Sequence, residues 1–125
     1  MDRQELEARS AAFAAAVVQL CKHARTEPGG RNPSDQLSNA ATSTAANYRA
    51  TSRSRSRKEF VAKMGTVAEE ADEAVFWLEL MLKTKLGDNA TVLILLAEAK
   101  ELRAIFAASY GTARRGKKPP PAGAE

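Results

Sequence analysis

The chain has 125 residues, enough for one domain, and 44% of them are hydrophobic, although much of that fraction is alanine. The formal charge of +4 and the pI near 9.5 favour contact with nucleic acid or an acidic protein, and a lone cysteine excludes an intramolecular disulfide. The longest strictly apolar run, residues 11–18, is too short to cross a bilayer and lacks the context of a signal peptide. We therefore expect a cytoplasmic protein with no membrane contact, whose alanine-rich core favours self-association.

The first predicted helix carries its apolar residues on one face, in steps of three, four and seven. These residues are Leu6, Phe13, Val17, Leu20 and Ala24. The helix is expected to end near Arg25, because the following Pro28 disfavours helical geometry in the residue before it.

A second helix is predicted to begin at Asn32 as its cap, with Pro33 in the first helical position, where its missing amide hydrogen costs nothing. Its inward stripe is narrow and made of small residues apart from its ends: Leu37, Ala41, Thr44 and Tyr48. The end of this helix is the least defined boundary, because residues 50–55 contain neither glycine nor proline and are able to continue as a helix.

The third helix has the clearest start, since Ser56 and Glu59 have the spacing of a capping box. Apolar residues then keep helical spacing over about six turns at Phe60, Met64, Val67, Ala71, Ala74, Leu78 and Leu82. Gly87 is predicted to supply the left-handed residue that ends the helix.

The fourth helix is predicted to be capped by Asp88 or Asn89. Its inward residues are Val92, Leu96, Ala99, Leu102, Phe106 and Ser109. Four amphipathic helices with short connections predict an all-α, antiparallel up-down-up-down four-helix bundle over residues 1–112. Residues 113–125 are basic and rich in proline, which predicts a disordered tail.

Several segments of these helices form recognisable motifs: residues 17–20, 35–40, 43–50, 55–64 and 70–80. In this order they resemble the four-helix-bundle proteins encoded in 23S ribosomal RNA intervening sequences, and the likeness covers roughly Leu6 to Tyr110. The family also looks related to the accessory variability proteins of diversity-generating retroelements. The resemblance implies a homopentamer with a nucleic-acid-binding role and no known enzymatic activity. The loop at residues 28–30, the alanine-rich first helix and the basic tail depart from the family pattern.

The most concentrated positive segment comprises Arg49, Arg53, Arg55, Arg57, Lys58 and Lys63. A turn near residues 54–56 would gather these side chains at one end of the bundle, where arginine forks and serine hydroxyls suit phosphate oxygens. The alternative interpretation is a solvated helix end paired with neighbouring acids. Arg114 and Arg115, followed by Lys117 and Lys118, either extend the positive surface or only keep the tail soluble.

The acidic run that follows contains Glu69, Glu70, Asp72, Glu73 and Glu79. A carboxylate metal site in a bundle needs Glu-x-x-His pairs, and the single histidine, His23, lies in another predicted helix. Since Glu70, Asp72 and Glu73 belong to a family-like motif, we predict polar contacts between helices or between subunits. Asn47, beside Tyr48 in another such motif, is a candidate partner for one of these carboxylates.

Phe76 and Trp77 adjoin Leu78, so the three side chains cannot all face one core. A bulky aromatic pair off the main seam indicates either a secondary core contact or a subunit interface. Cys21 and His23 diverge on a helix and support neither a nucleophile nor a metal site. No flanking strand accompanies the glycines at residues 29–30, so they do not form a phosphate-binding loop.

The sequence therefore predicts a non-enzymatic, homo-oligomeric bundle that needs no cofactor or metal and binds the RNA or DNA backbone electrostatically. The cationic cluster carries this prediction, and the absence of interleaved aromatic residues argues against reading of unpaired bases. A second interpretation is a protein-binding scaffold or adaptor, for example an accessory protein of a retroelement reverse transcriptase.

Overall fold

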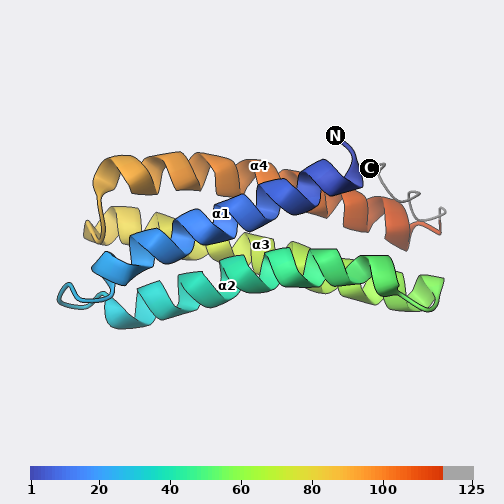
Figure 1. Cartoon of the computed structure of the whole chain (residues 1–125), viewed down its shortest axis with the longest axis horizontal. Helices are drawn as coiled ribbons and strands as arrows, with labels where there is room; N and C mark the ends of the chain where they lie inside the picture. The colour runs from blue at the N-terminus through green and yellow to red at the C-terminus, as the bar shows by residue number, and fades with distance from the viewer. Residues whose placement is uncertain (117–125) are drawn as a thin grey trace.

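The computed structural model describes residues 1–116, which form four long α-helices and one short 3₁₀ turn, with no β-strand among them. The helices are α1 (Arg3–Ala24), α2 (Arg31–Ala50), α3 (Arg57–Thr84) and α4 (Asn89–Arg114), and the 3₁₀ turn η1 is Thr51–Arg53. Figure 1 shows the helices side by side, with the α1–α2 and α3–α4 connections at one end and the α2–α3 connection at the other. The all-α prediction is confirmed, and most of the predicted tail, residues 117–125, lies outside the described part of the chain.

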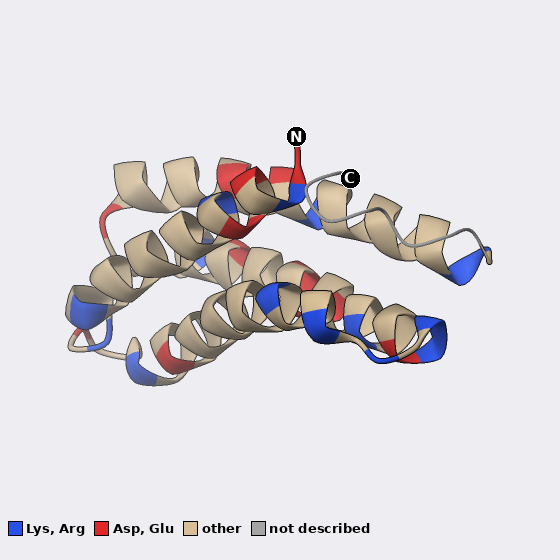
Figure 2. Cartoon of the chain, turned by 45° about the vertical axis from the view of Figure 1, so that its right-hand side comes forward, with Lys and Arg blue, Asp and Glu red and all other residues tan. Residues whose placement is uncertain are grey.

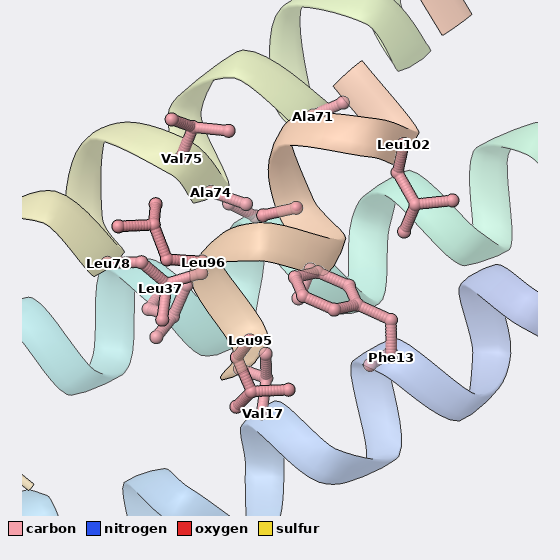
Figure 3. Close-up of a cluster of buried hydrophobic side chains, with 14 of the residues drawn as sticks. Phe13, Val17, Leu37, Ala71, Ala74, Val75, Leu78, Leu95, Leu96 and Leu102 are labelled. Atoms are coloured by element: carbon pink, nitrogen blue, oxygen red, sulfur yellow. The ribbon is translucent and has the colours of Figure 1, made fainter. Parts of the chain in front are cut away.

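One continuous core runs through the bundle, and side chains from all four helices point into it (Figure 3). The predicted inward residues of α1 and α2 are all buried. In the other two helices the predicted residues are buried except Leu82, which is partly buried and packs against the core, and Ser109, which is partly buried. Val75, Met81 and Leu95 are buried in addition. The buried faces of α3 and α4 are wider than a single row of apolar residues, because α3 packs extensively against both α2 and α4.

The connection between α1 and α2 depends on Gly30. The helix ends at Ala24, as predicted, and a Cβ atom on Gly30 would lie 1.9 Å from the carbonyl oxygen of that residue. This tight turn lets α2 begin at Arg31 with Gly30 as its N-cap, so the predicted Asn32 cap is wrong. Pro33 becomes the third helical residue, still within the first turn, where amide hydrogens have no partner inside the helix.

The junction between α2 and α3 brings the chain around through η1. Helical geometry continues to Arg53, and then Ser54 takes an extended conformation with ψ 134°. The Ser56 hydroxyl accepts the Glu59 amide at 3.0 Å, which confirms one half of the predicted capping box. The Glu59 carboxylate instead accepts the amide of Arg55 at 3.4 Å, one residue earlier than the predicted partner.

The left-handed residue that ends α3 is Lys85, with φ 59°, and not the predicted Gly87. The Lys85 amide donates to the Leu82 carbonyl at 3.3 Å and the Leu86 amide to the Met81 carbonyl at 2.9 Å, which is the Schellman pattern. Gly87 has its own positive φ of 73°, and a Cβ there would lie 2.9 Å from Leu20 Cδ1. Asp88 caps α4 by accepting the Thr91 amide at 3.0 Å, as one of the two predicted caps.

Candidate nucleic-acid interface

The basic residues predicted to contact phosphate gather at the end of the bundle where α2 ends, α3 begins and α4 ends (Figure 2). We call this set the cationic end: Arg49, Arg53, Arg55, Arg57, Lys58, Arg114 and Arg115. Arg57 Nη2 donates to the Ala113 carbonyl oxygen at 3.1 Å and so joins the first turn of α3 to the last turn of α4. This contact brings Arg114 and Arg115 beside the junction between α2 and α3.

Six cations of this end are exposed, and four of them, Arg49, Arg53, Arg55 and Lys58, lie at the junction between α2 and α3. Arg49, Arg53 and Lys58 are exposed and make no ion pair with any residue of the described chain. The Arg55 side chain is 90% exposed and lies 3.5 Å from Glu59, a distance and an exposure at which an ion pair contributes little. At this junction four positive charges are therefore available to an anionic partner, and the exposed Arg114 and Arg115 lie beside them.

Two other predicted cations have structural contacts. Arg57 donates to the Ala113 carbonyl at the end of α4, which also accepts the Gly116 amide at 3.3 Å. Lys63 Nζ lies 3.1 Å from the Glu59 carboxylate, and this interaction lowers the pKa of Glu59. Lys63 also lines a groove of about 120 Å³ between α2 and α3, together with Asn47, Ala50 and Thr66. Because Glu59 balances its charge, Lys63 contributes less to an interface than the four exposed cations of the α2–α3 junction.

Arg3 is a cation at this end that sequence reasoning missed. It is 9% exposed, and Nη2 donates to the Tyr48 carbonyl oxygen at 2.7 Å and to the Thr51 hydroxyl. Its guanidinium also lies 4.6 Å from the centre of the Tyr48 ring. The start of α1 thus supports the last turn of α2. A signal was present, because Arg3 precedes Leu6 by three residues and shares its inward face.

Acidic side chains at the start of α1 offset only part of the positive charge at this end. Asp2 accepts the Glu5 amide at 2.8 Å, and Glu7 lies 3.1 Å from Arg3. Both carboxylates therefore have partners within α1. Glu5 adds one negative charge in the first turn of this helix, where it interacts favourably with the positive end of the helix dipole.

The predicted polar contact between α2 and α3 is present within one subunit. Asn47 Nδ2 donates to Glu70 Oε1 at 2.7 Å. Tyr48, the next residue, is fully buried, and its ring centre lies 5.0 Å from that of Phe106 in α4. These two residues join helices of one chain.

Replacing Glu70 by alanine is expected to lower the free energy of unfolding by about 1 kcal/mol, because the Asn47 amide then loses a part-buried hydrogen bond. Urea denaturation measures the change. Glu73→Ala is the matched control, since Glu73 is exposed one turn further along α3 with no ion pair in the described chain. Equal losses in the two variants would contradict the assigned role of the Asn47 contact.

The remaining predicted contact residues divide between helix contacts and exposed surface. Asp72 Oδ1 lies 3.2 Å from Arg103 Nη1 and links α3 to α4. Trp77 is partly buried against the core, and Phe76 packs edge-on against it with ring centres 4.9 Å apart. Phe76 is 54% exposed.

Two kinds of site have no counterpart in residues 1–116. No cluster of three or more histidine, cysteine or carboxylate side chains is arranged there to hold a metal ion. None of the helices in this range combines the length and the apolarity needed to cross a membrane.

Comparison with known proteins gives one family and one solved structure of note. A family model described as 23S rRNA-intervening sequence protein matches residues 3–108. The chain is also similar to a crystal structure from Bacteroides thetaiotaomicron, described as a protein with unknown function from the S23 ribosomal protein family. The two share 26% sequence identity and a TM-score of 0.75 over 82% of this chain and 95% of the other. No curated protein matches the chain.

Proposed function

Because the chain belongs to the 23S rRNA-intervening sequence protein family, we propose that it is a cytoplasmic, non-enzymatic protein that binds nucleic acid through phosphate contacts. The observation that carries this proposal is the set of four exposed cations at one end of the bundle, Arg49, Arg53, Arg55 and Lys58. Arginine and lysine side chains that neutralise phosphates release condensed counterions, and this release supplies most of the affinity in binding without sequence preference.

The chemistry of the cationic end favours backbone contact over base recognition. Its exposed positive charges suit phosphate oxygens, which arginine can contact with two parallel hydrogen bonds. The guanidinium of Arg114 lies 5.3 Å from the centre of the half-buried Tyr110 ring and covers part of that ring. Phe76, the exposed aromatic residue, lies about five turns into α3 from this end. Stacking of unpaired bases therefore finds little support at this end.

We also propose that the chain self-associates, with five subunits as the family resemblance implies. The alternating connections favour an up-down-up-down bundle that presents the same cationic end from every copy of a ring. Exposed apolar side chains at Phe76, Leu93 and Ile94, up to 70% exposed, offer surface for such contacts. Light scattering is expected to give about five times the chain mass of 13.5 kDa. A stable monomer would contradict this part.

The binding proposal is tested by titrating a duplex RNA and a duplex DNA with the full chain over a salt series. If about four phosphates are contacted by one cationic end, the logarithm of the affinity should fall with the logarithm of the salt concentration at a slope of roughly −3.6. Several ends acting together would steepen the slope. No binding to either duplex at low salt would refute the proposal.

A protein-binding scaffold is the alternative function, and the exposed Phe76 beside Trp77 favours it. Such a partner would have an acidic surface for the cationic end or an apolar surface for Phe76; a retroelement reverse transcriptase is one candidate. A gene position beside a reverse transcriptase supports this function, whereas a position inside a ribosomal RNA insertion supports nucleic-acid binding.

A further inference from the structure

The far end of the bundle, where α1 and α3 end and α2 and α4 begin, is also positive. Its loops pack together, since the Glu27 carboxylate accepts the Gly87 amide at 3.2 Å through each of its oxygens. Four exposed cations surround these loops and form what we call the opposite end: Lys22, Arg31, Lys83 and Lys85. These four residues are spread over more than sixty positions of the sequence, so the sequence has no run of basic residues that predicts this positive surface.

The acids of the opposite end are engaged in contacts of their own. Asp35 lies 2.7 Å from Arg25, whose hydrogen bond lowers the pKa of the Asp35 carboxyl group. The Glu27 carboxylate accepts a hydrogen bond from the Gly87 amide. The Asp88 carboxylate accepts hydrogen bonds from the amide and the hydroxyl of Thr91, at 3.0 Å and 2.7 Å. Each carboxylate at this end thus has a donor within the chain.

The four cations of the opposite end have no ion pair within residues 1–116. Lys83 follows Glu79 by four residues on α3, yet the two side chains do not form a salt bridge. The first turn of α2 adds amide donors beside Arg31, because its N-cap, Gly30, has no side chain to satisfy them. The opposite end therefore combines four cations without ion pairs and a helix N-terminus that has no side-chain cap.

The middle of the bundle has the opposite sign. Its carboxylates are Glu69, Glu70, Asp72, Glu73, Glu79, Glu98 and Glu101. Most of its cations are neutralised, since Arg9 lies 2.7 Å from Glu98 and 2.8 Å from Glu101, and Arg103 pairs with Asp72. In Figure 2, blue Lys and Arg segments lie at both ends of the ribbon, and red Asp and Glu segments lie between the ends as well as at the N-terminus. A phosphate backbone lying along the bundle would meet this acidic surface.

The two ends are far enough apart to act independently. The 28 residues of α3 span about 42 Å, which is several times the Debye length of about 8 Å at physiological ionic strength. A nucleic acid held at one end is therefore screened from the charges of the other end, and each end has to be considered as a separate site.

We propose that the opposite end is a second phosphate-binding surface, so that each subunit holds nucleic-acid backbone at both of its ends and not along its side. This proposal rests on the proposed function, because it assumes that the cationic end binds phosphate. It implies that one subunit joins two backbone segments about 40 Å apart, either in two molecules or in one folded molecule. In a ring of parallel subunits, the two faces would each present a positive rim.

Chemical acetylation of lysines in the full chain, read by mass spectrometry with and without a duplex RNA, tests the proposal residue by residue. Lys58 reports on the cationic end, Lys22, Lys83 and Lys85 on the opposite end, and the exposed Lys100 on the middle. At an RNA concentration 100 times Kd, blocked lysines should react up to about 100-fold more slowly, while the rate at Lys100 should stay nearly unchanged.

The outcomes separate this inference from the function on which it rests. Slower reaction at Lys58 and at the three opposite-end lysines supports two surfaces. Slower reaction at Lys58 with unchanged rates at Lys22, Lys83 and Lys85 overturns the second surface and leaves the first intact. Unchanged rates at all five lysines, under conditions where RNA is in excess, overturn the proposed function itself.

A charge variant of the opposite end provides an independent measurement. It combines Lys22→Ala, Arg31→Ala and Lys83→Ala with Lys85→Asn, because asparagine tolerates the left-handed conformation of Lys85. The salt slope for duplex RNA is expected to become shallower by up to about 3.6, and Lys100→Ala serves as the control. A slope equal to that of the unmodified chain would overturn the second surface.

Discussion

Replacing Arg49, Arg53, Arg55 and Lys58 together by alanine is expected to remove most nucleic-acid binding at the cationic end. Each lost phosphate contact makes the salt slope shallower by about 0.9, so four contacts account for about 3.6. Extrapolated from 1 M salt, where electrostatic binding is weak, this corresponds to about 3.6 orders of magnitude of affinity at 0.1 M salt. Fluorescence anisotropy with labelled duplex RNA over a salt series measures both quantities.

The four positions are chosen because their side chains have little to do with folding. They are exposed, and Arg55 makes the only ion pair among them, a long one at 3.5 Å. Arg57 is left in place because it holds the Ala113 carbonyl, and its loss would weaken the contact between α3 and α4. The free energy of unfolding of the fourfold variant should therefore stay within about 0.5 kcal/mol for each substitution.

A matched pair of single substitutions separates local contact from total charge. Lys58→Ala and Lys100→Ala each remove one exposed lysine from a helix, but Lys58 lies at the cationic end and Lys100 in the acidic middle. We expect Lys58→Ala to make the salt slope shallower by about 0.9 and Lys100→Ala to leave it nearly unchanged. Equal effects of the two substitutions would show that the interface is not at the cationic end.

Replacing Arg3 by alanine is expected to lower the free energy of unfolding by about 2–3 kcal/mol. The substitution removes charge-assisted hydrogen bonds to the Tyr48 carbonyl and the Thr51 hydroxyl, and the contact with the Tyr48 ring. Since the guanidinium is buried at the end of α2, water cannot replace these interactions fully. Thermal and urea denaturation should show the loss, with a fall in melting temperature of roughly 10 °C.

Two controls identify the guanidinium geometry as the cause. Arg31→Ala removes the same side chain from an exposed position without an ion pair in the described chain, and should change the free energy of unfolding by less than about 0.5 kcal/mol. Arg3→Lys keeps the charge but not the planar fork, so it should recover only part of the loss. If Arg3→Ala were as stable as Arg31→Ala, the contact between α1 and α2 would not have the importance assigned to it.

The sequence predicted buried and capping residues correctly where the interaction depends on residues of the same helix. Apolar spacing placed Leu6, Val17, Leu78 and Phe106 in the core, because the period of an α-helix alone decides which residues share a face. The Ser56 cap was predictable for the same reason, since the hydroxyl and the amide that it accepts are three residues apart. Such interactions need no knowledge of how the helices pack.

Cap and loop positions that depend on another helix were predicted less well. Gly30 replaces Asn32 as the cap of α2 because the turn must pass close to the Ala24 carbonyl at the end of α1. At Gly87 a side chain is excluded because a Cβ atom would lie too close to Leu20. The left-handed residue that ends α3 is instead Lys85. Neither constraint is visible in local sequence, because each involves atoms of an element distant along the chain.

The sequence by itself determined that the chain is a set of amphipathic helices with a dense positive segment around residues 49–63. Only the tertiary structure decided which cations are free, because a charge is neutralised by whatever lies near it in space. Folding buries Arg3, engages Arg57 with α4 and pairs Lys63, while it leaves Arg49 and Arg53 in solvent. It also gathers Lys22, Arg31, Lys83 and Lys85 from three helices and a loop, since helices of similar length place alternate connections at the same end.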